Sequence, residues 1–215
     1  MLGAHYALFV VYKNCESGVN AGSVAGPLGD YFSSSAVVLR GVYDPSAMSA
    51  DANLMLWLHS ESAMDLQKAF RYLGKVFCNM RVLWSAMGVH RDAEFNKSHV
   101  PAFISGEPPK DWLTIYPFVR TPEWYLIPDE ERKDMLAEHG DRARAFMSVK
   151  PNTLAAFSLG NYEWLLPMES DSLIDLVDLM RALRYTRARR YVLLETPFYT
   201  GRRIGIADVQ EVLST

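Results

Sequence analysis

The chain has 215 residues, 49% of them hydrophobic and 22% charged, and its 25 acidic and 22 basic residues give a net charge of −3. This charge disfavours a nucleic-acid-binding protein, because such proteins carry an excess of Lys and Arg, and every apolar run is far shorter than the roughly 18 residues of a membrane span. Two cysteines are too few for a disulfide framework, so we expect a cytoplasmic protein.

The first half of the chain is expected to form strand, helix, strand, strand, helix and strand. Short runs rich in β-branched and aromatic residues predict the strands, and the spacing of Leu66, Ala69 and Leu73 predicts the second helix. In chain order, the expected elements cover residues 4–12, 20–35, 36–43, 53–59, 60–79 and 82–90.

The second half is expected to repeat this order. Apolar residues at helical spacing predict its two helices, and Gly160-Asn161 is a turn signal between two of its strands. The expected elements are a strand at 111–120, a helix at 129–146, strands at 152–159 and 162–169, a helix at 171–184 and a strand within 189–202.

The shared order of elements indicates an internal duplication. Residues 60–66 (SESAMDL) and 170–176 (SDSLIDL) also match at a constant offset, and each begins a helix with Ser followed by acidic residues. Two ferredoxin-like βαββαβ units predict an α+β fold in which the sheets face each other as a dimeric α+β barrel. Such a barrel would have its helices outside and a pocket between the sheets.

The duplication predicts an N-terminal half at 1–92 and a C-terminal half at 111–215. The linker between them, 93–110, contains three prolines and little periodicity. Loops of this length are usually functional or disordered.

The strand at 111–120 has an apolar face and a mixed face. The two-residue period places Leu113 and Ile115 on the apolar face, which we expect to lie under the helices. It places Tyr116 and Arg120 on the other face, pointing into the pocket between the sheets. These two residues are either a packed Tyr beside a solvated Arg, or a site where Arg binds a ligand carboxylate and Tyr transfers a proton or an electron.

The helix at 129–146 carries His139 on its apolar stripe with Met135 and Ala143. A histidine on a buried face is either a hydrogen-bonded core residue or a ligand, and a neutral imidazole in an aromatic cavity suits a heme iron. Gly140 suggests an interruption of the helix that would let the ring approach a metal.

His99 lies in the linker and has two interpretations. It is a surface histidine or, if the linker folds over the pocket, a base with a pKa of about 6.5 that is suited to peroxide.

A cluster of arginines follows the acidic residues of the helix at 171–184. This order complements the helix dipole, so we interpret the cluster as a solvated helix end rather than a nucleic-acid patch. Its members are Arg181, Arg184, Arg187, Arg189 and Arg190.

Recognisable motifs run through the chain from the linker onward. The segments are EFNKSHVPAF at 94–103, YPFVR at 116–120, EWYL at 123–126, MLAEHG at 135–140, NYEW at 161–164 and TPFYTG at 196–201. Together they resemble the coproheme decarboxylases, the peroxide-dependent heme synthases of the chlorite dismutase superfamily. The resemblance covers about half of the chain, and the linker histidine is similar to that of the actinobacterial type.

The resemblance implies an enzyme of heme biosynthesis. Such an enzyme converts iron coproporphyrin III (coproheme) to heme b by oxidising two propionates to vinyl groups, with hydrogen peroxide as the oxidant. The resemblance also implies the duplicated ferredoxin-like barrel, a porphyrin bound in the C-terminal half, a homopentamer, and a transient contact with a coproporphyrin ferrochelatase.

The resemblance assigns roles to five residues. His139 matches the axial ligand of the heme iron, and Tyr116 matches the residue that becomes an oxidising radical. His99 matches the distal histidine that deprotonates peroxide. Arg120 takes the place of a basic residue that holds a propionate, and Trp124 lies in the neighbouring part of the porphyrin pocket.

The chain departs from the family pattern at three positions. Tyr191 stands where His is common, Leu194 where Glu is common, and Met168 replaces an aromatic residue. Glu195 is the candidate partner for the proximal imidazole.

Other functions stay open at this point: chlorite dismutase activity, heme peroxidase activity and a non-enzymatic heme carrier. Chlorite dismutases use a distal arginine on the strand after the proximal helix, and residues 151–155 (PNTLA) contain none. A carrier would need His139 but would have no need of Tyr116.

Overall fold

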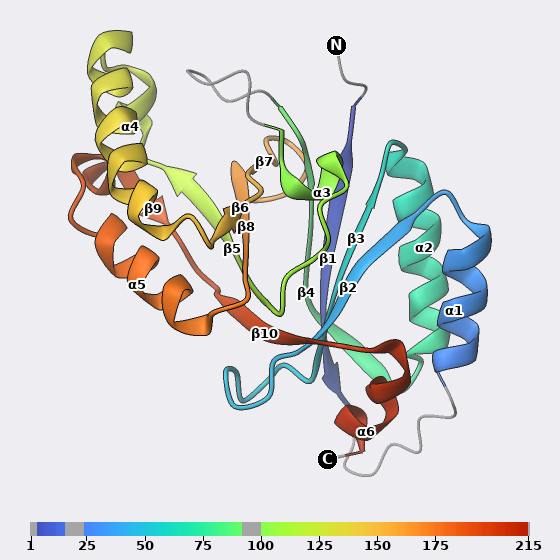
Figure 1. Cartoon of the computed structure of the whole chain (residues 1–215). Coiled ribbons are helices and arrows are strands. Elements are labelled where there is room, and N and C mark those ends of the chain that lie inside the picture. The colour runs from blue at the N-terminus through green and yellow to red at the C-terminus, as the bar shows by residue number, and fades with distance from the viewer. Residues whose placement is uncertain (1–3, 16–23, 92–99, 215) are drawn as a thin grey trace. The chain divides into compact units, whose positions relative to one another are not determined.

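The computed structural model describes residues 4–15, 24–91 and 100–214, which form two compact units (Figure 1). The first unit runs to His90 and includes the C-terminal segment from Tyr199, and the second runs from Arg91 to Phe198. Among the described residues, no helix is both long and apolar enough to cross a membrane.

The first unit is an antiparallel sheet with strands in the order β4-β1-β3-β2-β10. From β1 to β4 its elements follow the predicted βαββαβ order. The elements are β1 (Tyr6–Asn14), α1 (Ala25–Ser34), β2 (Val38–Asp44), β3 (Leu54–Ser60), α2 (Ala63–Val76), β4 (Met80–Val89), β10 (Tyr199–Ile204), the 3₁₀ turn η4 (Ile206–Asp208) and α6 (Val209–Leu213).

The core of the first unit lies between this sheet and its helices. Alternate residues of β3, Leu54, Leu56 and Leu58, are fully buried in one cluster with Leu66 and Leu73 of α2. The two-residue period of the strand and the helical period of α2 thus bring their apolar faces together.

The second unit repeats the plan around the antiparallel pair β5 and β8, in which Trp112 lies opposite Ser170. β6 and β7 pair with opposite ends of β8, and β9 pairs with the end of β5. The elements are α3 (Ala102–Ser105), β5 (Trp112–Arg120), η1 (Pro122–Tyr125), α4 (Asp129–Ala143), η2 (Arg144–Phe146), β6 (Lys150–Pro151), β7 (Leu154–Ala155), β8 (Trp164–Ser170), α5 (Leu173–Leu183), η3 (Arg187–Tyr191) and β9 (Val192–Leu194).

The repeated serines form the same local structure in both units, as the duplication predicts. Ser172 caps α5 by accepting the backbone N–H of Asp175 at 3.4 Å, and Ser170 accepts the N–H of Ser172 at 3.1 Å. The matching bonds in the first unit are Asp65 N–H to Ser62 (3.2 Å) and Ser62 N–H to Ser60 (3.2 Å).

The predicted strand at 152–159 is wrong in extent, because only the two-residue strand β7 forms within it and the two-residue strand β6 lies just before it. The Asn152 side chain between them accepts the N–H of Phe103 and donates to Glu169. These bonds draw the segment into a polar network instead of a continuous ladder.

The last predicted strand, within 189–202, is two strands, β9 and β10. Pro197 lies between them and cannot donate a ladder hydrogen bond. The segment from Tyr199 packs with the first unit, because β10 pairs with β2, whereas the sequence-based division placed it in the half at 111–215.

We predict that Ser172→Ala lowers the free energy of unfolding by about 1 kcal/mol, because the N–H of Asp175 loses its side-chain acceptor. Urea-induced unfolding measures this change, and Ser62→Ala should lower stability to a similar extent. Ser33→Ala is the control, since Ser33 is exposed on α1. Equal stability of Ser172→Ala and the unmodified protein would contradict the capping role.

Candidate active site

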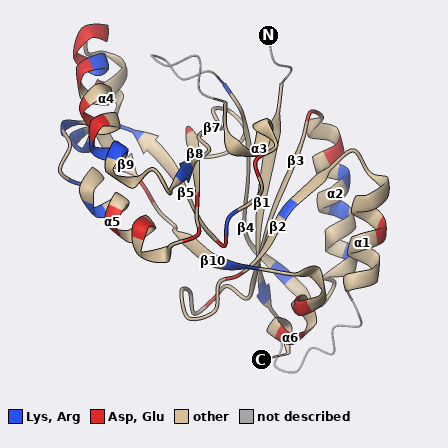
Figure 2. Ribbon diagram, in the orientation of Figure 1, with Lys and Arg blue, Asp and Glu red and all other residues tan. Residues whose placement is uncertain are grey.

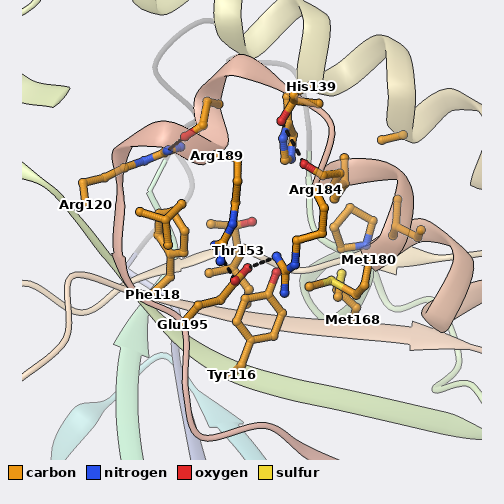
Figure 3. A pocket seen from close by; sticks show the side chains of 18 of the residues that line it. Tyr116, Phe118, Arg120, His139, Thr153, Met168, Met180, Arg184, Arg189 and Glu195 are labelled. Carbon is orange, nitrogen blue, oxygen red and sulfur yellow. Dashed lines mark hydrogen bonds and ion pairs between the residues drawn. The ribbon is translucent and has the colours of Figure 1, made fainter.

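A cavity of about 420 Å³ lies in the second unit, between the β5–β8 sheet and the helical segments α4, α5 and η3 (Figure 3). This size falls within the roughly 300–1,000 Å³ of small-molecule sites. The polar side chains that line it are those of Tyr116, Arg120, His139, Thr153, Arg184, Thr186, Arg189 and Glu195. The remaining lining is apolar, so the cavity suits a largely apolar ligand with a few charged groups.

β5 presents Tyr116, Phe118 and Arg120 to this cavity, and Leu113 and Ile115 are buried on its other face. The sequence correctly predicts that Tyr116 and Arg120 share a face and a pocket. The predicted location of that pocket is wrong, because it lies under the helices and not between two sheets. Both faces of β5 are buried, so the alternation of apolar and polar residues could not identify the face that the helices cover.

Tyr116 is 3% exposed, and its ring stacks on Phe198 with 4.4 Å between centroids. Burial raises the pKa of the phenol well above its usual value of 10.0; the charge of Glu195 raises it further, whereas Arg184 and Arg189 lower it. Tyr116 therefore keeps its proton at neutral pH. Its hydroxyl can lose that proton readily only together with an electron.

Arg120 is held by aromatic rings and by a backbone carbonyl. Its guanidinium lies 3.9 Å from the ring centroid of Trp124 and 4.6 Å from that of Phe118. It also donates to the carbonyl oxygen of Ala188 at 3.0 Å. Trp124 is 5% exposed in an apolar cluster with Ala188. It contacts the Arg120 guanidinium and is not among the residues that line the cavity.

His139 projects from α4 into the cavity, on the predicted stripe with Met135 and Ala143. The suggested interruption at Gly140 is wrong, because α4 continues to Ala143. Burial lowers the pKa of His139 below 6.5, and Arg120 lowers it further, against opposing effects of Glu138 and Glu195. The imidazole is therefore neutral near pH 7, the form in which histidine binds a metal.

Glu195 accepts hydrogen bonds from two arginines, from Arg184 at 2.7 Å and from Arg189 at 2.6 Å. The sequence suggested Glu195 as the hydrogen-bond partner of the His139 imidazole. In the structure the Glu195 carboxylate instead forms hydrogen bonds with the two guanidinium groups. The interpretation of the arginine cluster as a solvated helix end is incomplete for Arg184 and Arg189, which are partly exposed and also line the cavity. No local pattern predicts this, because Arg184 and Arg189 reach the cavity only through the fold of the chain at η3.

The structure brings together three of the five predicted site residues, His139, Tyr116 and Arg120. Trp124 contacts Arg120 but does not itself line the cavity. His99 lies outside the described residues. Among the described residues, no group of three or more His, Cys, Asp or Glu side chains could hold a bare metal ion. A single histidine in such a cavity suits an iron whose other ligands come from a porphyrin.

Comparisons with known proteins agree on one family. The sequence model of the chlorite dismutase family matches residues 22–204. The chain is 48% identical to the coproheme decarboxylase of Mycolicibacterium smegmatis over 176 residues, which cover 80% of this chain and 76% of that protein.

Solved structures are similar over nearly the whole chain. A crystal structure of a putative chlorite dismutase has a TM-score of 0.87 at 20% identity and covers 98% of this chain and 99% of its own. The chlorite dismutase of Candidatus Nitrospira defluvii, in complex with imidazole, has a TM-score of 0.83 at 17% identity and covers 98% and 95%. At these identities the likeness shows a shared fold.

We predict that Arg120→Gln raises the pKa of His139 toward 6.5 in the porphyrin-free protein, because the variant removes a nearby positive charge that disfavours the imidazolium. An NMR titration of the His139 ring protons measures the midpoint. Arg181→Gln, which removes an exposed guanidinium from α5, should leave it unchanged. A midpoint that is the same in Arg120→Gln as in the unmodified protein would contradict the electrostatic coupling of Arg120 and His139.

Proposed function

The chain belongs to the chlorite dismutase family, and from this premise we propose that it decarboxylates two propionates of coproheme to give heme b, with hydrogen peroxide as the oxidant. The observation that carries this proposal is that one cavity gathers a neutral histidine, a buried phenol and a fixed guanidinium, those of His139, Tyr116 and Arg120. The 48% identity to a coproheme decarboxylase over most of both chains supports the same reaction.

The residues of the cavity fit an iron porphyrin. His139 offers one neutral nitrogen ligand, the apolar lining suits the macrocycle, and guanidinium groups at the cavity wall suit the propionate carboxylates. When bound, the porphyrin iron supplies the oxidising equivalents that peroxide delivers.

In this proposal, the protein side chains position the substrate and move one proton. His139 holds the iron, and Arg120 binds a propionate with a guanidinium that its aromatic neighbours have already oriented. Tyr116 loses an electron together with its Oη proton. The resulting phenoxyl would take a hydrogen atom from the β-carbon of the neighbouring propionate and become a phenol again. The propionate would lose its second electron to the oxidising equivalents that peroxide delivers, and release of carbon dioxide would leave a vinyl group.

We further propose that His99 is the base that deprotonates peroxide. This assignment rests on the sequence match around residues 94–103. The finer expectations from the resemblance, a cytoplasmic homopentamer that contacts a coproporphyrin ferrochelatase, are part of the same proposal.

Chlorite dismutase activity is the second candidate, since the family model carries that description. The segment with β6 and β7, which follows the helix α4 that carries His139, argues against it. Pro151 and Thr153 line the cavity there, and neither supplies the guanidinium that the sequence analysis associates with chlorite chemistry. The experiment that tests the decarboxylase also distinguishes it from a heme peroxidase and from a heme carrier.

We predict that the protein loaded with iron coproporphyrin III loses two carboxyl groups in succession when peroxide is added. Mass spectrometry of the extracted porphyrin follows the two losses of carbon dioxide, and the product is heme b. Intact coproheme after many equivalents of peroxide, or bleaching without decarboxylation, would mean that the protein is a carrier or a peroxidase.

We predict that Tyr116→Phe binds coproheme and consumes peroxide, yet releases carbon dioxide at least about a hundredfold more slowly, because it keeps the buried ring and loses only the hydroxyl that forms the phenoxyl. The matched control is Tyr125→Phe, which removes a hydroxyl that donates to Glu163 and should decarboxylate at the unmodified rate. Heme b formation by Tyr116→Phe at that rate would move the radical to another residue.

We predict that His139→Ala alters the visible spectrum of the bound ferric coproheme and weakens its binding at least about tenfold, because the iron loses its nitrogen ligand. Binding of iron-free coproporphyrin III, measured by fluorescence, is the internal control and should change little. An unchanged spectrum together with unchanged coproheme affinity would remove His139 as the ligand.

A further inference from the structure

One end of the cavity holds more positive than negative charge. Figure 3 shows the Glu195 carboxylate between the guanidinium groups of Arg184 and Arg189, with the ring of Tyr116 beside them. Figure 2 shows the arginines gathered where the chain leaves α5 and turns toward β9. With Arg120, the cavity is lined by three guanidinium groups and one carboxylate, an excess of two positive charges that favours an anionic ligand.

Glu195 is chemically what a ligand carboxylate would be. The Glu195 side chain is 11% exposed and accepts one short hydrogen bond from each arginine, the charge-assisted bonds that a propionate would also accept. The side chains of Arg184 and Arg189 are 37% and 39% exposed. Each side chain is therefore accessible to a second acceptor, and its guanidinium has N–H groups besides the one that it donates to Glu195.

Tyr116 shows that this ion-pair cluster lies close enough to act on the proposed site of oxidation. The ring of Tyr116 lies beside the Glu195 carboxylate and the two guanidinium groups in Figure 3, and their charges act on the pKa of its buried phenol, Glu195 raising it and the arginines lowering it. A carboxylate that reaches Arg184 or Arg189 would thus lie near the hydroxyl of Tyr116.

We propose that Glu195 is a specificity-determining residue that competes with ligand carboxylates for Arg184 and Arg189. This inference rests on the proposed function. An incoming propionate exchanges with Glu195 on one or both guanidinium groups, and Glu195 returns to them when that carboxylate has been lost. The competition weakens binding of a porphyrin whose carboxylates reach this end of the cavity and leaves the affinity for a porphyrin without them unchanged.

The test compares two ligands of nearly the same shape and different charge, iron coproporphyrin III and the same iron porphyrin with its four carboxylates converted to neutral amides. Glu195→Gln keeps the shape and an acceptor oxygen while it removes the competing charge. We expect it to bind the acid about tenfold or more tightly than the unmodified protein does, and the amide within about twofold. Absorbance titration measures both affinities, and isothermal titration calorimetry confirms them.

Two further variants separate competition from other effects. Asp178→Asn removes one exposed negative charge from α5 and should leave both affinities within about twofold, so a general change of net charge is controlled. Arg184→Gln removes one contested guanidinium and should weaken binding of the acid about tenfold but not of the amide. This variant keeps the proposal testable if Glu195→Gln fails to fold.

The results also distinguish this inference from the proposed function. Equal or weaker binding of the acid by Glu195→Gln would overturn the competition and leave Glu195 as a structural support for the two arginines, while decarboxylation by the unmodified protein would still stand. Failure of the unmodified protein to bind iron coproporphyrin III at all would overturn both.

Discussion

The site depends on one constraint, the antiparallel pairing of β5 with β8. This register places Tyr116 opposite Leu166 and Phe118 opposite Trp164. The two-residue period of the strand then sends Tyr116, Phe118 and Arg120 to the same side, where α4 and α5 pack. A slip of one residue would send Leu113 and Ile115 to the cavity and remove both the phenol and the guanidinium from it.

The duplication supplies an internal comparison for this constraint. Ser60 and Ser170 mark equivalent positions in the two sheets, so Val10 of β1 corresponds to Tyr116 of β5. Val10 is fully buried in the core between the first sheet and its helices, whereas its counterpart lines a cavity. The same scaffold is therefore closed by apolar packing in one unit and leaves a cavity in the other.

The sequence was sufficient for the parts of this account that depend on local patterns. The order of elements in the first unit, the shared face of Tyr116 and Arg120, the stripe that carries His139 and the repeat of the serine-containing helix starts all follow from periodicity and capping chemistry. The similarity to known proteins bears out the family that the motifs indicated.

The sequence failed where the outcome depends on tertiary packing. Both faces of β5 are buried, so polarity could not show which face lies under the helices. Arg184 and Arg189 look like a solvated helix end until η3 folds back and pairs them with Glu195. The short strands around Asn152 depend on a partner 49 positions earlier, Phe103, a contact that no local pattern predicts.

The central claim is that the porphyrin lies between the β5–β8 sheet and the helices α4 and α5. The most direct measurement is a crystal structure of the protein with iron coproporphyrin III bound. Our account predicts electron density for the macrocycle in this cavity, with the iron bonded to a ring nitrogen of His139 and propionates at Arg120 and near Tyr116. A porphyrin on the opposite face of β5, over Leu113 and Ile115, or an iron held by another residue, would contradict it.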